Sequence, residues 1–331
     1  MNIDLQARHI QPLRPTFSRV LPYLKNNRPA SRYQEATLGI QPTHNFHYRP
    51  SWEPQYELFD KQRSAIQMQD WDSLQDPRQY YYATWTIARA RQQETMDSNN
   101  QFIESHNLID RIPDQLREKA CQALTPLRHV AWAANMNNCQ ICATGYGAAL
   151  TSPAMMHAMD HLGIAQYLTR ISLALGDTEG LDAGKQAWLH EPQWQPLRKL
   201  VEDMLVIQDP MELFVAQNFV LDGLLYPFVY THYIDDYLAI NGGTALGMLS
   251  VFMSEWYTES SPWVNAVLKT CAAESEANKA QINAWYMTYT EKVKQSLEPV
   301  ADFILGEIGQ SLLNMLKDQL DTRAHSLGIC Q

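Results

Sequence analysis

The sequence predicts an all-α bundle of long helices preceded by an extended N-terminal arm. Glycine is scarce, at 14 of 331 residues, which disfavours sheets built on tight turns. Seven of the 17 prolines fall within residues 12–54, among aromatic residues that follow no helical spacing. From residue 76 onward, a capping side chain is repeatedly followed by proline, and this pair is typical of the first turn of a helix.

The arm is expected to span residues 1–75. A proline-rich segment of this kind cannot close a core of its own, yet it carries large aromatic side chains that are costly to leave in water. Either the arm folds back on its own domain, or it lies over a partner chain. The aromatic residues considered as interface anchors are Phe17, Tyr23, Tyr33, Phe46, Tyr48, Trp52 and Tyr56.

The helical domain is expected to span residues 76–331. Its start signals are Asp76-Pro77, Thr125-Pro126, Ser152-Pro153, Asp209-Pro210 and Ser261-Pro262. The predicted helices are 77–105, 113–124, 126–150, 153–175, 210–240, 243–258, 262–292 and 299–323, with shorter pieces near 185–207. The longest would measure about 37–45 Å, which suits an antiparallel bundle. Gly223 and Pro227 predict a kink or bulge inside 210–240, because proline removes a helical hydrogen bond.

Charge and hydropathy exclude several classes of protein. Twenty-six Lys and Arg against 36 Asp and Glu give a net charge of −10, which argues against binding to nucleic acid or to an anionic membrane. The most apolar stretch, 211–230, is interrupted by polar side chains and is too polar to span a membrane. The N-terminal residues have no secretory pattern, and five cysteines, an odd number, indicate reduced thiols. These features predict a cytoplasmic protein.

A bundle of long helices can hold two irons between Glu residues and Glu-x-x-His pairs, because the i, i+3 spacing places both ligands on one face. The sequence contains no Glu-x-x-His. His157 and His161, one turn apart with Asp160 between them, could form part of a metal site, although a hydrogen-bonded core pair is favoured. Cys139 and Cys142 are expected in the middle of a helix, where packing is favoured over redox chemistry.

Two segments and the arm carry a resemblance to a known family. Residues 80–94, Tyr-Tyr-Tyr-Ala-Thr-Trp-Thr-Ile-Ala-Arg-Ala-Arg-Gln-Gln-Glu, and residues 159–166, Met-Asp-His-Leu-Gly-Ile-Ala-Gln, resemble the β subunit of bacterial multicomponent monooxygenase hydroxylases. Phenol hydroxylase is the member that the sequence resembles in particular, and the resemblance covers nearly the whole chain. It implies a ferritin-like fold, in which only the α subunit holds the carboxylate-bridged diiron centre.

The resemblance also gives the positions at which an α subunit would carry its iron ligands. Here they are occupied by Ala131, His161, Ile164, Leu221, Glu255 and Thr258, with Asp222 one residue from Leu221. Side chains of Ala, Ile, Leu and Thr do not bind iron, and one Glu with one His does not make a dinuclear site. The resemblance therefore implies that this chain holds no metal, no cofactor and no catalytic residue.

The resemblance further implies partners. The assembly would be a dimer of αβγ protomers that hydroxylates phenols or related aromatics with O2. An NADH-dependent reductase containing FAD and a [2Fe-2S] cluster would supply electrons, and a small regulatory protein would dock on the hydroxylase. The arm would then lie over α. Two alternatives stay open: a catalytic metalloprotein with a depleted site around His157, Asp160, His161 and Glu255, and a stand-alone helical binding module.

Overall fold

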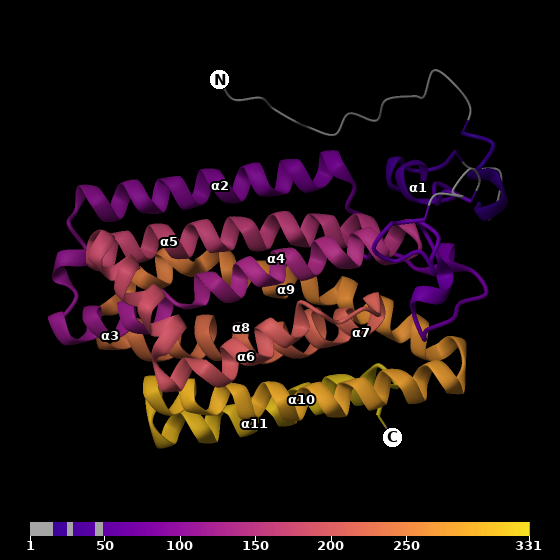
Figure 1. Cartoon of the computed structure of the whole chain (residues 1–331). Coiled ribbons are helices and arrows are strands. Elements are labelled where there is room, and N and C mark those ends of the chain that lie inside the picture. Colours follow the sequence, from indigo (N-terminus) through magenta and orange to yellow (C-terminus); the bar gives the residue numbers. More distant parts are fainter. Residues whose placement is uncertain (1–15, 25–28, 44–48, 331) are drawn as a thin grey trace.

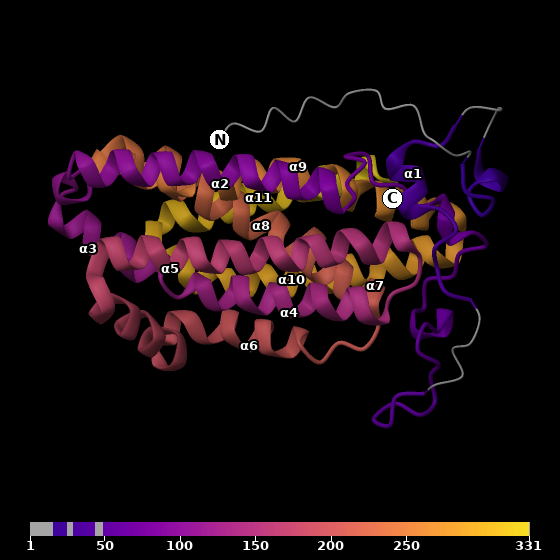
Figure 2. The ribbon, with the colours of Figure 1, turned by 90° about the horizontal axis from the view of Figure 1, so that it is seen from above.

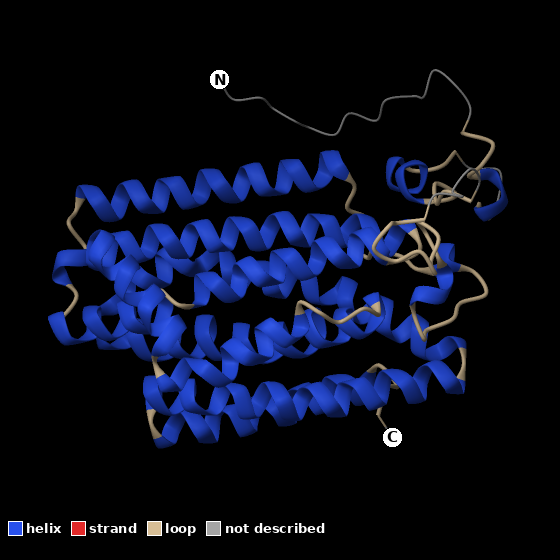
Figure 3. Ribbon diagram, viewed as in Figure 1, coloured by secondary structure: helices blue, strands red, loops and turns tan. Residues whose placement is uncertain are grey.

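The computed structural model describes residues 16–24, 29–43 and 49–330, and within these ranges every regular element is helical (Figures 1 and 3). Phe46 and Tyr48 lie outside the described residues. The α-helices are α1 (Arg32–Thr37), α2 (Tyr82–Ser105), α3 (Asp114–Leu124), α4 (Leu127–Thr144), α5 (Ala148–His190), α6 (Gln195–Met204), α7 (Pro210–Phe214), α8 (Asp222–Tyr226), α9 (Thr244–Glu274), α10 (Glu276–Leu305) and α11 (Glu307–Ser326). The all-α prediction is confirmed.

The long helices form a layered bundle. Helices α4 and α5 run antiparallel, with α2 along one side of the pair and α6 along the other (Figure 2). Helices α10 and α11 form the opposite side of the molecule, and α9 runs through the middle (Figure 1). Non-helical backbone angles at Gly176 and Asp177 break α5, which agrees with the predicted end of that helix at residue 175.

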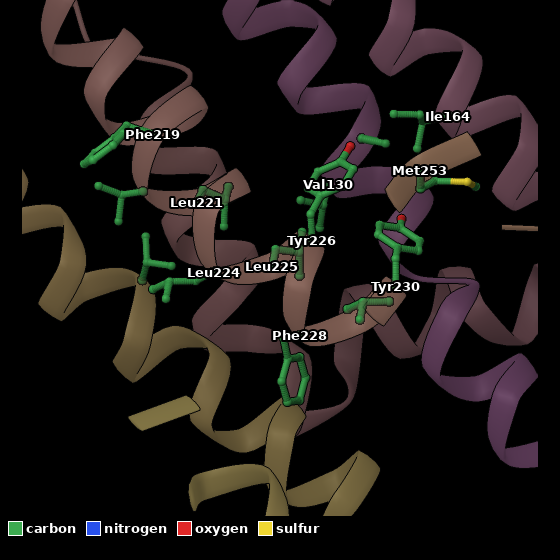
Figure 4. Packing of buried hydrophobic residues seen from close by; sticks show 14 of the residues in the cluster. Val130, Ile164, Phe219, Leu221, Leu224, Leu225, Tyr226, Phe228, Tyr230 and Met253 are labelled. Carbon is green, nitrogen blue, oxygen red and sulfur yellow. The ribbon is translucent and has the colours of Figure 1, made fainter. Parts of the chain in front are cut away.

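The central segment 210–243 is the most buried part of the bundle. It starts where predicted, because the Asp209 carboxylate accepts hydrogen bonds from the backbone N–H groups of Met211 and Glu212. The expected kink or bulge takes the form of two π-helical stretches, Val215–Leu221 and Pro227–Gly243, on either side of α8. Leu221, Leu224 and Phe228 project from this segment into the core (Figure 4).

The apolar character of this region has a structural explanation. The helical run Pro210–Glu274, which is interrupted by non-helical backbone angles at Asn241 and Gly242, contains an 18-residue window with a mean hydropathy of 1.3. Contrary to the expectation from its polar side chains, this run is apolar enough by length and composition to cross a membrane. Within the fold, 94% of that window is buried. Packing against the other helices therefore accounts for its hydropathy.

Three of the five predicted start signals do not begin a helix. Asp76 and Pro77 form a turn before α2, and Pro153 and Pro262 lie inside α5 and α9. The missing N–H of Pro153 would leave the carbonyl of Ala149 without its helical partner, but the indole N–H of Trp263 donates to that oxygen at 3.1 Å. A partner distant in sequence therefore permits proline within this helix.

The ends of the later helices also differ from the prediction. The break expected near residue 260 lies at Ser275, whose hydroxyl accepts a hydrogen bond from the Asn278 N–H and so caps α10. The start expected at residue 299 lies at Gly306, whose φ of 60° is a conformation that favours glycine. This region therefore contains three helices, as predicted, but the two breaks between them lie further along the chain than expected.

The first part of the arm keeps several aromatic side chains exposed. Trp52 is 80% exposed, Phe17 and Tyr23 are exposed to about 40%, and the Arg63 guanidinium covers the ring of half-buried Tyr56. Tyr33 is half-buried, and its hydroxyl accepts a hydrogen bond from the Asp76 N–H at 2.7 Å. This part of the arm thus folds on itself and contacts the helical domain through Tyr33 and through Gln41, whose side-chain oxygen accepts a hydrogen bond from the Gly147 N–H at 2.9 Å.

The second part of the arm belongs to the core. Ile66, Trp71 and Leu74 are buried among residues of the bundle. Asn278 exchanges hydrogen bonds with the Gln67 backbone, donating to its carbonyl and accepting from its N–H at 2.8 and 3.1 Å. The stretch 64–74 therefore packs as part of the helical domain.

Candidate functional site

The structure buries most of the side chains at the family's ligand positions. Ala131, His161, Ile164 and Leu221 are all at most 6% exposed. Glu255 and Thr258, in contrast, lie on the exposed side of α9, and Trp256 is the buried residue of that turn. Because Glu255 points away from the bundle interior, the structure does not bring it together with His161.

His161 is part of a buried polar chain that crosses the bundle. Its Nδ1 is hydrogen-bonded to the Tyr226 hydroxyl at 3.3 Å, and its Nε2 lies 3.5 Å from Asp222 Oδ2 without hydrogen-bond alignment. The other oxygen of Asp222 accepts from the Gln217 amide at 2.9 Å, and Gln217 accepts from Asn137 at 2.9 Å. Asp222, rather than Leu221, is therefore the neighbour of His161.

His157 has no hydrogen-bond partner on either ring nitrogen, although it is only 1% exposed. Its ring packs against Trp256 and Trp263, with ring centres 5.2 and 4.5 Å away. Burial, with the nearby Arg78 guanidinium as a smaller cause, holds the pKa of His157 well below its usual value. His157 is thus a neutral packing residue. Of the two histidines predicted to be hydrogen-bonded in the core, only His161 has a hydrogen-bond partner.

We expect the stability of the chain to fall as the pH drops below about 6.5, the ordinary pKa of histidine. The unfolded chain protonates His157 there and the folded chain does not, so protonation favours unfolding by up to about 1.4 kcal/mol per pH unit. His129, whose pKa burial lowers to about 4, acts in the same direction. Urea unfolding at pH values between about 5 and 7.5 measures the slope.

The variant His157→Phe keeps a ring between the two tryptophans and removes the titrating group. It should have a shallower slope than the wild type over this range, with the part due to His129 remaining. His190→Phe, at the exposed end of α5, is the matched control. An unchanged slope in His157→Phe would show that His157 is protonated in the folded chain.

Asp160 is the centre of a second buried network, which joins three helices. Its carboxylate accepts from the indole N–H of Trp85 at 3.0 Å and from that of Trp256 at 2.9 Å. The Arg89 guanidinium donates to both of its oxygens, at 2.6 and 2.7 Å, and also to both oxygens of Glu259. Helix α2 is therefore fastened to α5 and α9 through charge-assisted hydrogen bonds.

The same network continues into the segment before α2. Both carboxylate oxygens of Asp76 accept hydrogen bonds from the Arg78 guanidinium, which also lies 3.9 Å from Glu259. Burial alone would lower the pKa of Arg89, but its hydrogen bonds to Asp160 and Glu259 outweigh this and raise it. Arg89 is thus held as a cation with two carboxylate partners.

Sequence reasoning missed the role of Asp160 as the acceptor of this network, and it missed Arg89 altogether. The available signal was the spacing of Trp85 and Arg89, one turn apart on a helix whose other side chains are mostly polar. Cys139 and Cys142 lie in the interior of α4, and burial raises the pKa of both thiols. This agrees with their interpretation as packing residues.

The donor set does not fit a dinuclear iron centre. Such a centre in a helical bundle uses four carboxylates and two histidines that project inward. Among the described residues, Asp222 is the one carboxylate within 4 Å of a His161 ring nitrogen, and Asp160 is fully engaged by Arg89 and two indoles. Among residues 16–24, 29–43 and 49–330, no three His, Cys, Asp or Glu side chains are grouped as metal ligands would be.

The comparison with known proteins decides the family. The family model described as methane/phenol/alkene hydroxylase matches residues 52–275, which is more than half of the chain. The chain belongs to this hydroxylase family. It is 42% identical over 331 residues to the phenol 2-monooxygenase oxygenase component DmpL of Pseudomonas sp. strain CF600, covering 99% of this chain and 98% of the relative.

Two further relatives agree. The crystal structure of xenon-pressurized phenol hydroxylase from Pseudomonas sp. OX1 contains a chain that superposes with a TM-score of 0.90 and 37% identity, covering 98% of both chains. The β subunit of the toluene-4-monooxygenase hydroxylase component of Ectopseudomonas mendocina is 21% identical over 264 residues, 78% of each chain. The resemblance to phenol hydroxylase and the expected ferritin-like fold are thereby confirmed.

Proposed function

We propose that this chain is the non-catalytic β subunit of a phenol hydroxylase. The observation that carries the proposal is the combination of 42% identity to a phenol 2-monooxygenase oxygenase component with the donor set around His161, which, among the residues that the structure describes, does not supply the ligands for two irons. The chemistry would then reside in an α subunit that holds the diiron centre. This chain would contribute no metal, no cofactor and no catalytic side chain.

The proposed assembly is a cytoplasmic dimer of αβγ protomers that hydroxylates phenols or related aromatics with O2. Its electrons would come from NADH through a reductase with FAD and a [2Fe-2S] cluster, and a small regulatory protein would dock on it. The densely bonded interior of this chain supports a structural role for it in the assembly. Ion pairs and indole hydrogen bonds hold the helices together around Asp160, and the apolar side chains of Ile164 and Leu221 are buried at ligand positions. A bundle fixed in this way can stabilise a partner subunit that packs against it.

The test is native mass spectrometry of the complex purified from its source, with iron counted in the same sample. We expect a large hetero-oligomer with about two irons for each larger subunit. On dissociation, this 38.0 kDa chain should leave without metal. A 38.0 kDa species that retains iron after separation would contradict the proposal.

The two alternatives have less support. A depleted metal site around His157, Asp160, His161 and Glu255 would need side chains that the structure keeps apart or engages elsewhere: Glu255 is exposed and Asp160 binds Arg89. A stand-alone binding module predicts a stable monomer without partner chains. The same mass measurement would detect it as a single uncomplexed species.

A further inference from the structure

One face of the molecule exposes large apolar side chains in two adjacent rows. Trp132 and Met136 on α4 are 52% and 44% exposed, and Met155, Met159 and Leu162 on α5 are 37–43% exposed. The Asn135 amide donates to the Ala158 carbonyl at 2.6 Å, which joins the two helices between these rows. We call these five residues the α4–α5 face; Figure 2 looks onto its two helices.

This face carries no charge at neutral pH. Between Arg128 and Arg170 the only Asp, Glu, Lys or Arg is Asp160, which is buried and bound to Arg89, whereas 19% of the whole chain is charged. Burial lowers the pKa of His129 to about 4 and raises the pKa of Cys139 and of Cys142. The imidazole is therefore neutral and both thiols stay protonated.

These properties are those of the centre of a permanent protein interface. Interface cores are depleted of charged residues and enriched in Met and aromatic residues. A groove of about 340 Å³ between α2 and α5 adjoins the face, and Met159 lies on its wall together with Trp85, Tyr167 and Phe252. A side chain of the partner could enter this groove as an anchor.

We propose that the α4–α5 face binds the larger, iron-bearing subunit of the hydroxylase. This inference rests on the proposed function, because it assumes that such a subunit exists. Helix α4 alone is 18 residues, about 27 Å, so the face is long enough to pack against the long helices of a second helical subunit. A second copy is disfavoured because two chains with a net charge of −10 repel each other, and a neutral face does not offset that repulsion.

The test introduces two charges into the face of the full-length chain. Met136→Glu with Met159→Glu changes two exposed positions, so the chain should fold as the wild type does. Met287→Glu with Met315→Glu is the matched control, because these methionines are 59% and 40% exposed on α10 and α11. Each chain is co-expressed with the gene for the larger subunit, and complex formation is measured by native mass spectrometry.

We expect the face variant to bind the larger subunit on the order of 100-fold more weakly, since the new carboxylates would be buried without partners. The control variant should assemble like the wild type, and circular dichroism should be unchanged in both. If the wild type binds the larger subunit and the face variant binds equally well, this inference is wrong and the proposed function stands. If the wild type binds no larger subunit, both fail. If the wild type forms a homodimer that the face variant disrupts, the partner is a second copy and our assignment is wrong.

Discussion

Replacing Asp160 with Asn is expected to destabilise the chain by about 3–5 kcal/mol, the cost of breaking a buried ion pair on one side. Asn keeps the size of the side chain but supplies only one acceptor oxygen for the four donors that now reach the carboxylate. Arg89 would retain Glu259, whose side chain is 26% exposed and is the weaker partner. Denaturant unfolding of the full-length chain measures the loss.

The matched control is Asp97→Asn, the same substitution in an exposed ion pair between α2 and Arg170 of α5. Pairs of that kind contribute at most about 1 kcal/mol, so this variant should unfold close to the wild type. Tryptophan fluorescence gives a second readout, since Trp85 and Trp256 both donate to Asp160 and should change only in the first variant. Equal stability of the two variants would mean that the buried network does not hold α2 in place.

The helical class was predictable from the sequence, but the ends of several helices were not. Asp209-Pro210 starts a helix as its local pattern predicts, because the capping carboxylate and the N–H groups that it accepts from are neighbours in sequence. Ser152-Pro153 has the same pattern inside a helix, where Trp263, more than a hundred residues away, supplies the missing hydrogen bond. A local pattern cannot report a partner supplied by the tertiary fold.

In the candidate site, too, the sequence does not show which of two neighbouring residues faces the interior. The family resemblance places Leu221 and Glu255 at ligand positions, whereas in the structure Asp222 lies beside His161 and Trp256 donates to Asp160. The segment around Leu221 is π-helical, which shifts the face of each residue relative to an α-helix. The side that each of these residues faces depends on helix geometry and packing that the sequence does not display.

Truncation of the arm should separate assembly from folding. A chain that lacks residues 1–60 loses no member of the main hydrophobic core, which begins at Ile66, so it should unfold cooperatively at nearly the denaturant concentration of the full chain. It also loses Phe17 and Trp52, which are exposed and suited to cover a partner. We expect it to bind the larger subunit at least about tenfold more weakly, since aromatic anchors dominate interface energies.

A chain that lacks residues 1–75 should not reach a stable native state. It also loses Ile66, Trp71 and Leu74, and removing a buried side chain of this size costs about 2–5 kcal/mol. Three such losses are comparable with the whole stability of a domain, about 5–15 kcal/mol. Circular dichroism and denaturant unfolding distinguish the two chains.

If both truncated chains were equally stable, the stretch 64–74 would not belong to the core. If the chain that lacks residues 1–60 assembled like the full chain, the arm's aromatic residues would not be interface anchors.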